Sequence, residues 1–181
     1  VVIITGGFEA LKSAGHDGDI DYARSLLVER LALAAELADS YRVRLAFEPL
    51  HPMVCGFRSI VSTLQESLDI LDQMDDSHDI GLAIDTYALW WEHDLQEKLK
   101  RAGRRILNYH VSDWLADTRD LRLDRGMPGD GQIALCDWRH MIEAAGYFGP
   151  IEVEIFSRDR WWKTPAEKMI EEIIQRMNSA F

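Results

Sequence analysis

The stretch Val43-Arg-Leu-Ala-Phe-Glu-Pro-Leu-His-Pro52 contains a short apolar strand that ends in a carboxylate. Side chains alternate between the two faces of a strand, so Leu45 and Phe47 are expected to face a layer of helices. Glu48 is then expected to face an interior or a cleft. The two prolines end the strand, because proline has no N–H to donate to a neighbouring strand.

The same pattern recurs further along the chain. Apolar strands are predicted over residues 1–5, 80–85, 106–111 and 151–156, and the last three carry Asp85, His110 and Glu154 at or near their ends. Apolar residues at helical spacing predict helices over residues 19–40, 59–74, 94–102, 138–145 and 165–177. Asp19 or Asp21 is placed to cap the first of these helices.

Strands and helices therefore alternate along one α/β domain that covers residues 1–181. Such alternation predicts parallel strands joined by right-handed crossovers. Ligands of these folds bind beyond the carboxyl ends of the strands. Glu48, Asp85, His110 and Glu154 are expected to meet there as a metal site, and a donor set dominated by oxygen suits Mn²⁺ or Mg²⁺. The alternative is that each acidic residue is a surface group that happens to follow a strand.

The composition restricts the classes of partner. A formal net charge of −11 and an isoelectric point near 4.9 argue against a surface for nucleic acid or anionic membrane, and favour a small molecule. Cys55 and Cys136 lack metal-type spacing and are interpreted as thiols of a reducing compartment. We expect a cytoplasmic protein, since neither a membrane-spanning run nor a signal peptide is recognisable.

Five segments together resemble one family, the sugar phosphate isomerase/epimerase family of xylose isomerase-like TIM barrels. The segments are Phe47-Glu-Pro-Leu-His-Pro52, Ile84-Asp-Thr-Tyr87, His110-Val-Ser-Asp-Trp114, Asp124-Arg-Gly-Met-Pro-Gly-Asp-Gly131 and Pro150-Ile-Glu-Val-Glu-Ile-Phe-Ser157. The resemblance implies a TIM (β/α)8 barrel, of which this chain would contain the last five βα units as a partial barrel. The chain begins directly in a strand at Val1, so we expect the first three units to lie upstream of it, in an N-terminally truncated barrel.

The resemblance also implies a divalent metal cofactor. Mn²⁺ is the expected ion, and Mg²⁺, Co²⁺ and Zn²⁺ are the alternatives. The implied ligands are Glu48, Asp85, His110 and Glu154, and the two glutamates would be catalytic and exchange protons with the substrate. A metal that polarises a sugar carbonyl acidifies the neighbouring C–H bond and stabilises the resulting enediolate. The implied activity is that of a metal-dependent sugar or sugar-phosphate isomerase or epimerase.

Two alternatives stay open. Loss of a hydroxyl group from the same intermediate would give an inosose dehydratase-type lyase. The second alternative is a non-catalytic metabolite-binding fragment. It is motivated by the count of only five recognisable strands and by Ala88, which stands where many relatives have a substrate-binding histidine. Phosphodiester cleavage is disfavoured by the acidic charge.

Further residues are candidates for binding a sugar or polyol substrate. His51 could bind a substrate hydroxyl, and Arg125 could hold a substrate hydroxyl or phosphate. The pairs Trp90-Trp91 and Trp161-Trp162 lie just beyond strand ends, where aromatic rings can stack on a sugar, and Trp91 and Trp161 are the candidates chosen from them. The alternative interpretation of His51 and Arg125 is that they are exposed surface residues. The alternative for the tryptophans is packing at the barrel rim or against another subunit of a homo-oligomer. We also expect an interior ion pair between Arg44 and Glu152. The remaining histidines are interpreted as surface residues: His16, His78, His93 and His140.

Overall fold

The computed structural model describes residues 1–6, 15, 18–56, 58–75 and 78–179. Its strands are β1 (Val2–Ile4), β2 (Leu45–Phe47), β3 (Ile80–Asp85), β4 (Ile106–Val111) and β5 (Ile151–Val153). Its α-helices are α2 (Ile20–Ser40), α3 (Leu64–Leu71), α4 (Thr86–Leu89), α5 (Leu95–Ala102), α6 (Leu135–Ala144) and α7 (Ala166–Ser179). Short 3₁₀ helices are η1 (Pro52–Val54), η2 (Gly103–Arg105) and η3 (Trp161–Lys163).

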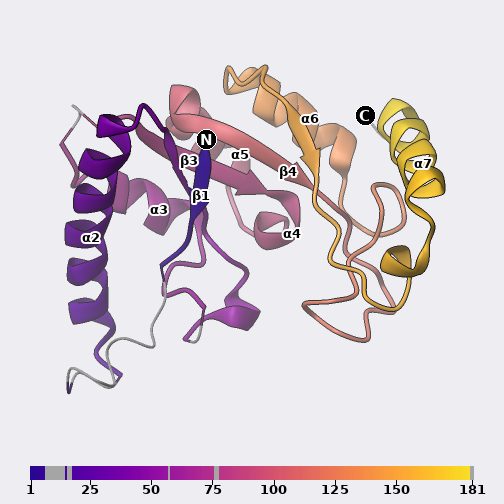
Figure 1. Cartoon of the computed structure of the whole chain (residues 1–181), viewed down its shortest axis with the longest axis horizontal. Helices are drawn as coiled ribbons and strands as arrows, with labels where there is room; N and C mark the ends of the chain where they lie inside the picture. The colour runs from indigo at the N-terminus through magenta and orange to yellow at the C-terminus, as the bar shows by residue number, and fades with distance from the viewer. Residues whose placement is uncertain (7–14, 16–17, 57, 76–77, 180–181) are drawn as a thin grey trace.

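All neighbouring strands are parallel, in the order β1-β2-β3-β4-β5. The prediction of an α/β fold with five βα units, arranged as part of a barrel, is therefore confirmed. Figure 1 shows α2 at one end of the molecule and α7 at the other, with the sheet between them. His16 lies outside the described residues.

Local hydrogen bonds set where the helices begin. Asp19 caps α2 by accepting a hydrogen bond from the N–H of Tyr22, as predicted. The helix predicted from residue 59 begins instead at Leu64, because Thr63 and Glu66 form a capping box at that point. The segment after β3 forms the short helix α4, whose first turn is capped by the carboxylate of Asp85.

The core lies between the sheet and the helices. Phe47, Leu82 and Ile84 are fully buried, and Leu64 and Leu68 of α3 are buried with them in one apolar cluster. Burying one such side chain contributes roughly 1.5–3 kcal/mol to stability. This layer gives the strands a rigid support, so that side chains on the other face of the sheet are held in fixed positions.

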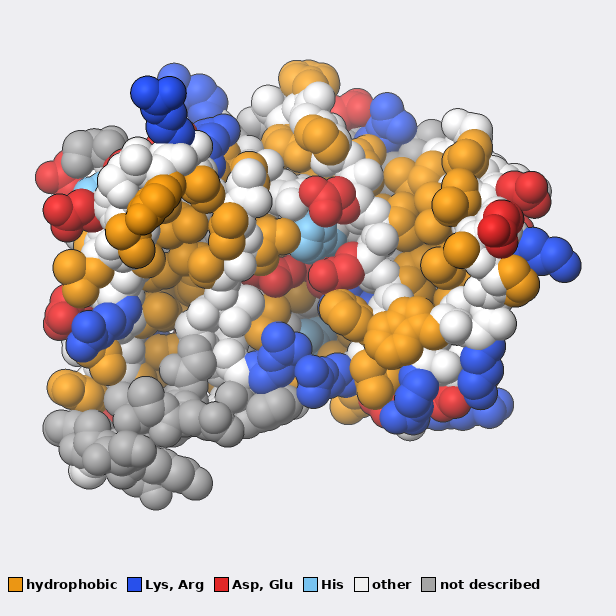
Figure 2. Space-filling view, in the orientation of Figure 1, with side chains coloured by type: hydrophobic (Ala, Val, Ile, Leu, Met, Phe, Trp, Pro, Cys, Tyr) orange, Lys and Arg blue, Asp and Glu red, His pale blue; other side chains and the backbone are white. Residues whose placement is uncertain are grey.

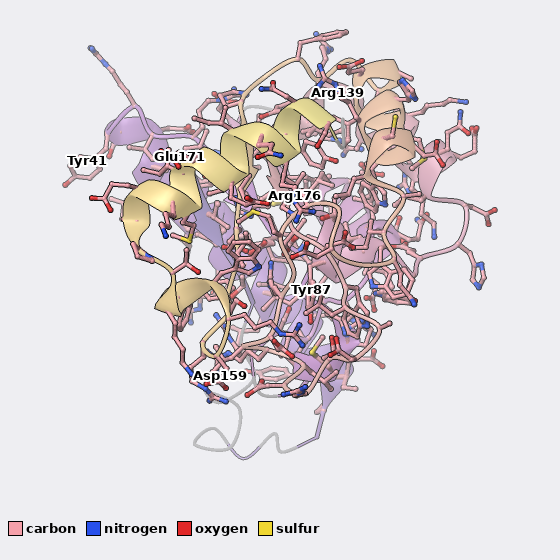
Figure 3. All side chains as sticks on the ribbon, turned by 90° about the vertical axis from the view of Figure 1, so that its right-hand side faces the viewer. Tyr41, Tyr87, Arg139, Asp159, Glu171 and Arg176 are labelled. Carbon is pink, nitrogen blue, oxygen red and sulfur yellow. The ribbon has the colours of Figure 1, made fainter. Side chains whose placement is uncertain are left out.

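The last helix is attached differently. In the described part of the chain α7 has no buried residue, and Ile170 and Ile174 are 56% and 58% exposed. Arg176, labelled on α7 in Figure 3, forms an ion pair with Asp130 at 3.1 Å and a second with Glu172 at 2.7 Å. An ion pair therefore connects α7 to the long loop between β4 and α6.

The predicted interior ion pair between Arg44 and Glu152 is wrong. The Nε of Arg44 lies 2.7 Å from the Oδ2 of Asp79, and both side chains are about half exposed. Leu45 is paired with Ile80 in the sheet, so the residues before these two strands are neighbours at its amino end. Glu152 instead accepts a hydrogen bond from the Nδ2 of Asn108.

The described residues also bear on the cysteines and on membrane-spanning segments. Both cysteines are unpaired and exposed. The helices found in those residues are too short or too polar to cross a membrane.

Gly81 is the tightest glycine position of the sheet and gives a test of the packing. A Cβ atom at this residue would lie 2.1 Å from the carbonyl oxygen of Arg105 and 2.6 Å from the Cγ of Leu107. We expect Gly81→Ala to force β3 and β4 apart and to lower the free energy of unfolding by about 1–3 kcal/mol. Urea unfolding followed by circular dichroism would measure the change.

Gly149→Ala is the matched control, because the atoms nearest to its added methyl group are at the outer end of the Tyr147 side chain. This control should lose less stability than Gly81→Ala. Equal losses in the two variants would contradict the proposed crowding of the sheet.

Candidate metal centre

The sheet places polar side chains of adjacent strands side by side. Asp85 of β3 is paired with His110 of β4, and His110 is paired with Glu152 of β5. In a parallel sheet, residues paired in this way point to the same face. Glu48 follows the end of β2 and Glu154 follows the end of β5, so these two carboxylates approach His110 from either side.

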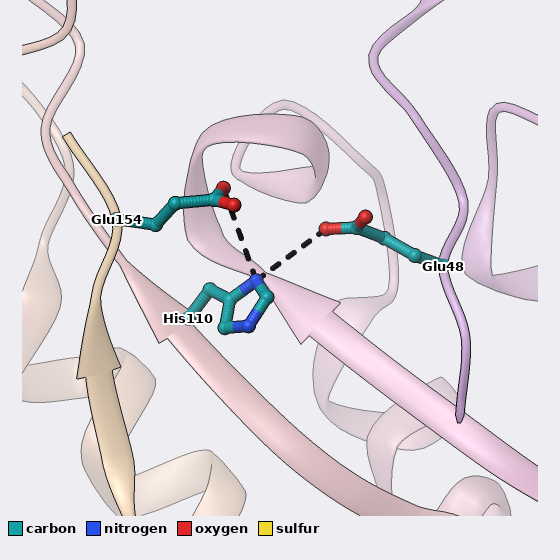
Figure 4. Close-up of side chains that lie close together, drawn as sticks. All are labelled: Glu48, His110 and Glu154. Carbon is teal, nitrogen blue, oxygen red and sulfur yellow. Dashed lines mark ion pairs between the residues drawn. The ribbon is translucent and has the colours of Figure 1, made fainter. Parts of the chain in front are cut away.

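Glu48, His110 and Glu154 form a compact group. The Nδ1 atom of His110 lies 3.5 Å from the Oε1 of Glu48 and 3.9 Å from the Oε2 of Glu154 (Figure 4). One ligand atom from each of the three residues lies within 4.8 Å of the others. On the face of the molecule that Figure 2 shows, here called the open face, acidic side chains surround a histidine near the middle, between two apolar areas.

These three residues fit a divalent cation. The Nδ1 of His110 is buried and has no hydrogen-bond partner among the described residues, although two carboxylates face it. Two donors that each lie about 2.1 Å from one cation can be at most about 4.2 Å apart, and both measured separations satisfy this limit. Two carboxylate oxygens and one imidazole nitrogen are a donor set found for Mn²⁺, Zn²⁺ and related ions.

The charges of the group act on its own pKa values. Burial lowers the pKa of His110, but the adjacent carboxylate of Glu48 and the charges of Glu154 and Asp85 outweigh it, so the pKa lies above its usual value. Burial and repulsion by Asp85 raise the pKa of Glu154, although Arg125 opposes this shift. A cluster of this kind stabilises additional positive charge.

Asp85 lies at the same rim but outside the group of three. It is 1% exposed, and its Oδ1 accepts the hydrogen bond from Tyr87 that begins α4. Its Oδ2 accepts a hydrogen bond from Nη1 of Arg125 at 2.9 Å, and the same Nη1 donates to the Oε2 of Glu154 at 3.1 Å. The role of Asp85 as a metal ligand stays a prediction, since in this structure its carboxylate is paired with a guanidinium.

The Arg125 side chain is held on several sides. Its guanidinium carbon lies 4.4 Å from the centre of the Tyr87 ring and 5.0 Å from that of Phe156. The loop that carries it is fixed by buried Asp113, which accepts hydrogen bonds from the backbone N–H groups of Gly129 and Gly131. Arg125 is therefore a fixed positive charge between two carboxylates.

A cavity of about 200 Å³ lies beside this arrangement. Of the residues predicted to bind substrate, His51 and Arg125 line it, together with Asp85. His51 is half-buried, which lowers its pKa, and its Nδ1 accepts a hydrogen bond from the N–H of Met53. Trp91 does not line the cavity but contacts the ring of His51 edge-on, with 5.9 Å between centroids.

Trp161 is also absent from the described cavity wall, and the adjacent Trp162 lines it instead. The indole of Trp162 is fixed by a hydrogen bond from its Nε1 to the carbonyl of Ile155 and by an edge-on contact with Phe156. The paired tryptophans in the sequence indicated an aromatic wall, but they did not indicate which ring forms it. Tyr87 and Phe156, which also line the cavity, were not predicted as site residues.

Glu152 is the other residue that sequence reasoning assigned incorrectly. Its Oε2 lies 3.9 Å from the Nε2 of His110, on the opposite side of the imidazole from Glu48. Glu152 therefore faces the Nε2 proton that His110 would carry if its Nδ1 bound a metal. Its position two residues before Glu154 was the available signal, because alternate strand residues share a face.

The pairing of Arg125 with Asp85 gives a test of this electrostatic arrangement. The Arg125 side chain is 13% exposed and that of Asp85 is 1% exposed. Removing only the guanidinium group leaves the buried Asp85 carboxylate without a charged partner, so Arg125→Gln should lower the free energy of unfolding by about 3–5 kcal/mol. Adding Asp85→Asn should restore part of this loss, as measured by urea unfolding of both variants at pH 7.

Arg139→Gln is the matched control, because Arg139 pairs with Glu143 on the exposed side of α6. It should change stability by about 1 kcal/mol or less. The absence of any recovery in the double variant would show that Asp85 and Arg125 are not energetically coupled.

Comparisons with known proteins show which solved structures share this fold. A Sinorhizobium meliloti protein of known structure is 44% identical, with a TM-score of 0.87, over 91% of this chain and 60% of that one. The zinc-bound IolI protein is 24% identical (TM-score 0.76), over 89% of this chain and 57% of that one. D-psicose 3-epimerase from Clostridium cellulolyticum, solved with D-tagatose, is 18% identical (TM-score 0.69), over 87% of this chain and 55% of that one.

The chain thus spans about 55–60% of the length of these three structures. A search of curated proteins gave no match. The sequence matches one family over residues 1–180, under the description xylose isomerase-like TIM barrel. Its parallel strands, the polar groups at their carboxyl ends and this match lead to one conclusion: the chain belongs to the xylose isomerase-like TIM barrel family.

Proposed function

We propose that this chain carries the metal and proton-transfer site of an isomerase or epimerase that acts on a sugar or related polyol. The observation that supports the proposal is the unpartnered Nδ1 of His110 between Glu48 and Glu154. Two structural neighbours are named as sugar epimerases, one acting on a 3-keto-D-glucoside and one on D-psicose, and a third holds zinc. We infer a divalent cation as the cofactor, and Mn²⁺ is the ion chosen for testing it.

In this proposal Glu48, His110 and Glu154 hold the cation, and Asp85 completes the set if Arg125 releases it. A bound cation polarises a substrate carbonyl and thereby acidifies the adjacent C–H bond. Arg125 and His51, which line the neighbouring cavity, hold substrate hydroxyl groups. The aromatic rings of Phe156 and Trp162 cover the apolar C–H face of the sugar.

The proton transfer is assigned to the two glutamates. Their side chains approach His110 from different strands, Glu48 after β2 and Glu154 after β5. One carboxylate removes the proton next to the carbonyl, and the other returns a proton from the opposite side, which inverts the carbon. Return of the proton to the neighbouring carbon would give aldose–ketose isomerisation instead. Loss of a hydroxyl group is the dehydratase alternative.

Metal binding is the first test. His110→Ala removes the only nitrogen donor of the group, so its affinity for Mn²⁺ should fall at least about tenfold, as measured by isothermal titration calorimetry. His140→Ala is the control, because His140 is exposed on α6. Unchanged affinity in His110→Ala would contradict the assigned site.

Proton transfer is tested by exchange with solvent. In D₂O with Mn²⁺, the chain should incorporate deuterium next to the carbonyl of D-psicose, D-fructose or D-tagatose, as observed by proton NMR. Glu48→Gln and Glu154→Gln should each slow this exchange by about 100-fold or more, since a side-chain acid or base contributes at least that much.

Glu143→Gln, at an exposed pair on α6, should leave exchange unchanged. Exchange that persists in both Gln variants would refute the assignment of the glutamates. Tight Mn²⁺ binding without exchange of any carbonyl sugar would support the metabolite-binding alternative instead.

A further inference from the structure

The cavity beside the metal centre has an unusual charge for this protein. Its wall contains three guanidinium groups, those of Arg58, Arg122 and Arg125, and one carboxylate, that of Asp85. The whole chain has a formal net charge of −11. The described wall of this cavity is thus positive, within a strongly acidic molecule. In Figure 2, basic side chains gather next to the acidic centre on the open face.

The three arginines of the cavity wall differ in their ion-pair partners among the described residues. Arg125 is committed to Asp85 and Glu154. Arg58 and Arg122 are exposed and make no ion pair with any described residue. Many other arginines of the chain do form such pairs: Arg24, Arg44, Arg101, Arg105, Arg139, Arg158, Arg160 and Arg176. Arg42, Arg104 and Arg119 are likewise unpaired among the described residues, so the feature that distinguishes Arg58 and Arg122 is that both line one cavity.

The backbone brings these two arginines together from distant segments. Arg58 follows η1, in the loop beyond the carboxyl end of β2, and its N–H donates to the carbonyl of Val54. Arg122 lies in the long loop beyond β4, where its N–H donates to the carboxylate of Asp120. Both positions are therefore fixed by backbone hydrogen bonds, while the guanidinium groups remain available to a ligand.

The apolar part of the cavity wall strengthens the attraction between these arginines and an anion. Leu121, Leu123, Phe156 and Trp162 supply apolar surface to the wall that also carries the arginines. An ion pair formed next to apolar groups is screened less by water than one on an open surface. A guanidinium group also matches the paired oxygens of a carboxylate or phosphate better than it matches a single hydroxyl group.

We infer that this cavity is a subsite for an oxyanion, in which Arg58 and Arg122 bind the carboxylate or phosphate group of an anionic sugar or polyol. The inference rests on the proposed function for the reacting end of the substrate, which lies at Glu48, His110 and Glu154. A neutral sugar would use Arg125 and His51 but would leave the two outer arginines without a partner. The subsite therefore selects a sugar phosphate or sugar acid over the corresponding neutral sugar.

The test compares matched ligands without requiring turnover. Isothermal titration calorimetry at constant ionic strength would measure D-fructose against D-fructose 6-phosphate, and D-sorbitol against D-gluconate. We expect at least one anionic ligand to bind about tenfold or more tightly than its neutral partner. The first pair reports a phosphate group and the second a carboxylate.

The variants locate the effect. Arg58→Gln combined with Arg122→Gln should abolish the preference for the anion and leave the affinity for D-fructose within about twofold. Arg104→Gln is the matched control, because Arg104 is also exposed and unpaired among the described residues but lies before β4, at the other end of the sheet. The preference should persist in His110→Ala, because neither arginine depends on the metal.

The outcomes separate this inference from the proposed function. Equal affinities for the charged and neutral ligands, or a preference that survives the double variant, would overturn the oxyanion subsite. A preference that disappears in His110→Ala would also overturn it, since the anion would then be bound at the metal. Deuterium exchange without an anion preference would refute only the subsite, and an anion preference without exchange would refute only the proposed chemistry.

Discussion

The repulsion among three carboxylates at the rim of the sheet is the constraint on which the rest of the site depends. Glu48 and Asp85 are less than 10% exposed and Glu154 is half-buried, so water screens their charges poorly. At 4 Å, two like charges repel by about 4 kcal/mol at an effective dielectric constant of 20. The fold can hold these groups together only where positive charge compensates them. Arg125 supplies part of this charge, and the unpartnered nitrogen of His110 marks where a cation would supply more.

The parallel sheet explains how one rim can collect these groups. The strands β2 and β3 are supported from behind by buried apolar side chains such as Phe47, Leu82 and Ile84. The register then aligns Asp85, His110 and Glu152 on a single face. The ligands thus lie in or directly after strands that the buried core supports, which suits a site whose distances must be accurate to about 0.5 Å.

The loops contribute a different kind of group. Arg125, Arg122 and Arg58 all lie outside the strands, and two of them belong to the long loop after β4. Asp113 gives that loop a fixed shape by accepting backbone hydrogen bonds from Gly129, Gly131 and Ile133. In the proposed division of tasks, the strand ends hold the cation and move the proton, whereas the loops recognise the remainder of the substrate.

The sequence by itself determined the order of strands and helices and the location of polar residues at strand ends. These features follow from local rules: alternation along a strand, helical spacing and capping by Asp19. The apolar spacing predicted a start near residue 59, whereas another local signal, the capping box of Thr63 and Glu66, sets the start of α3 at Leu64.

Only the tertiary structure decided which charges meet. Arg44 pairs with Asp79 instead of Glu152, Asp85 pairs with Arg125, and Trp162 instead of Trp161 faces the cavity. Each of these contacts joins residues far apart in the sequence or depends on the path of a loop. Such a path is set by packing and hydrogen bonds across the whole rim, and no periodicity in the sequence encodes it.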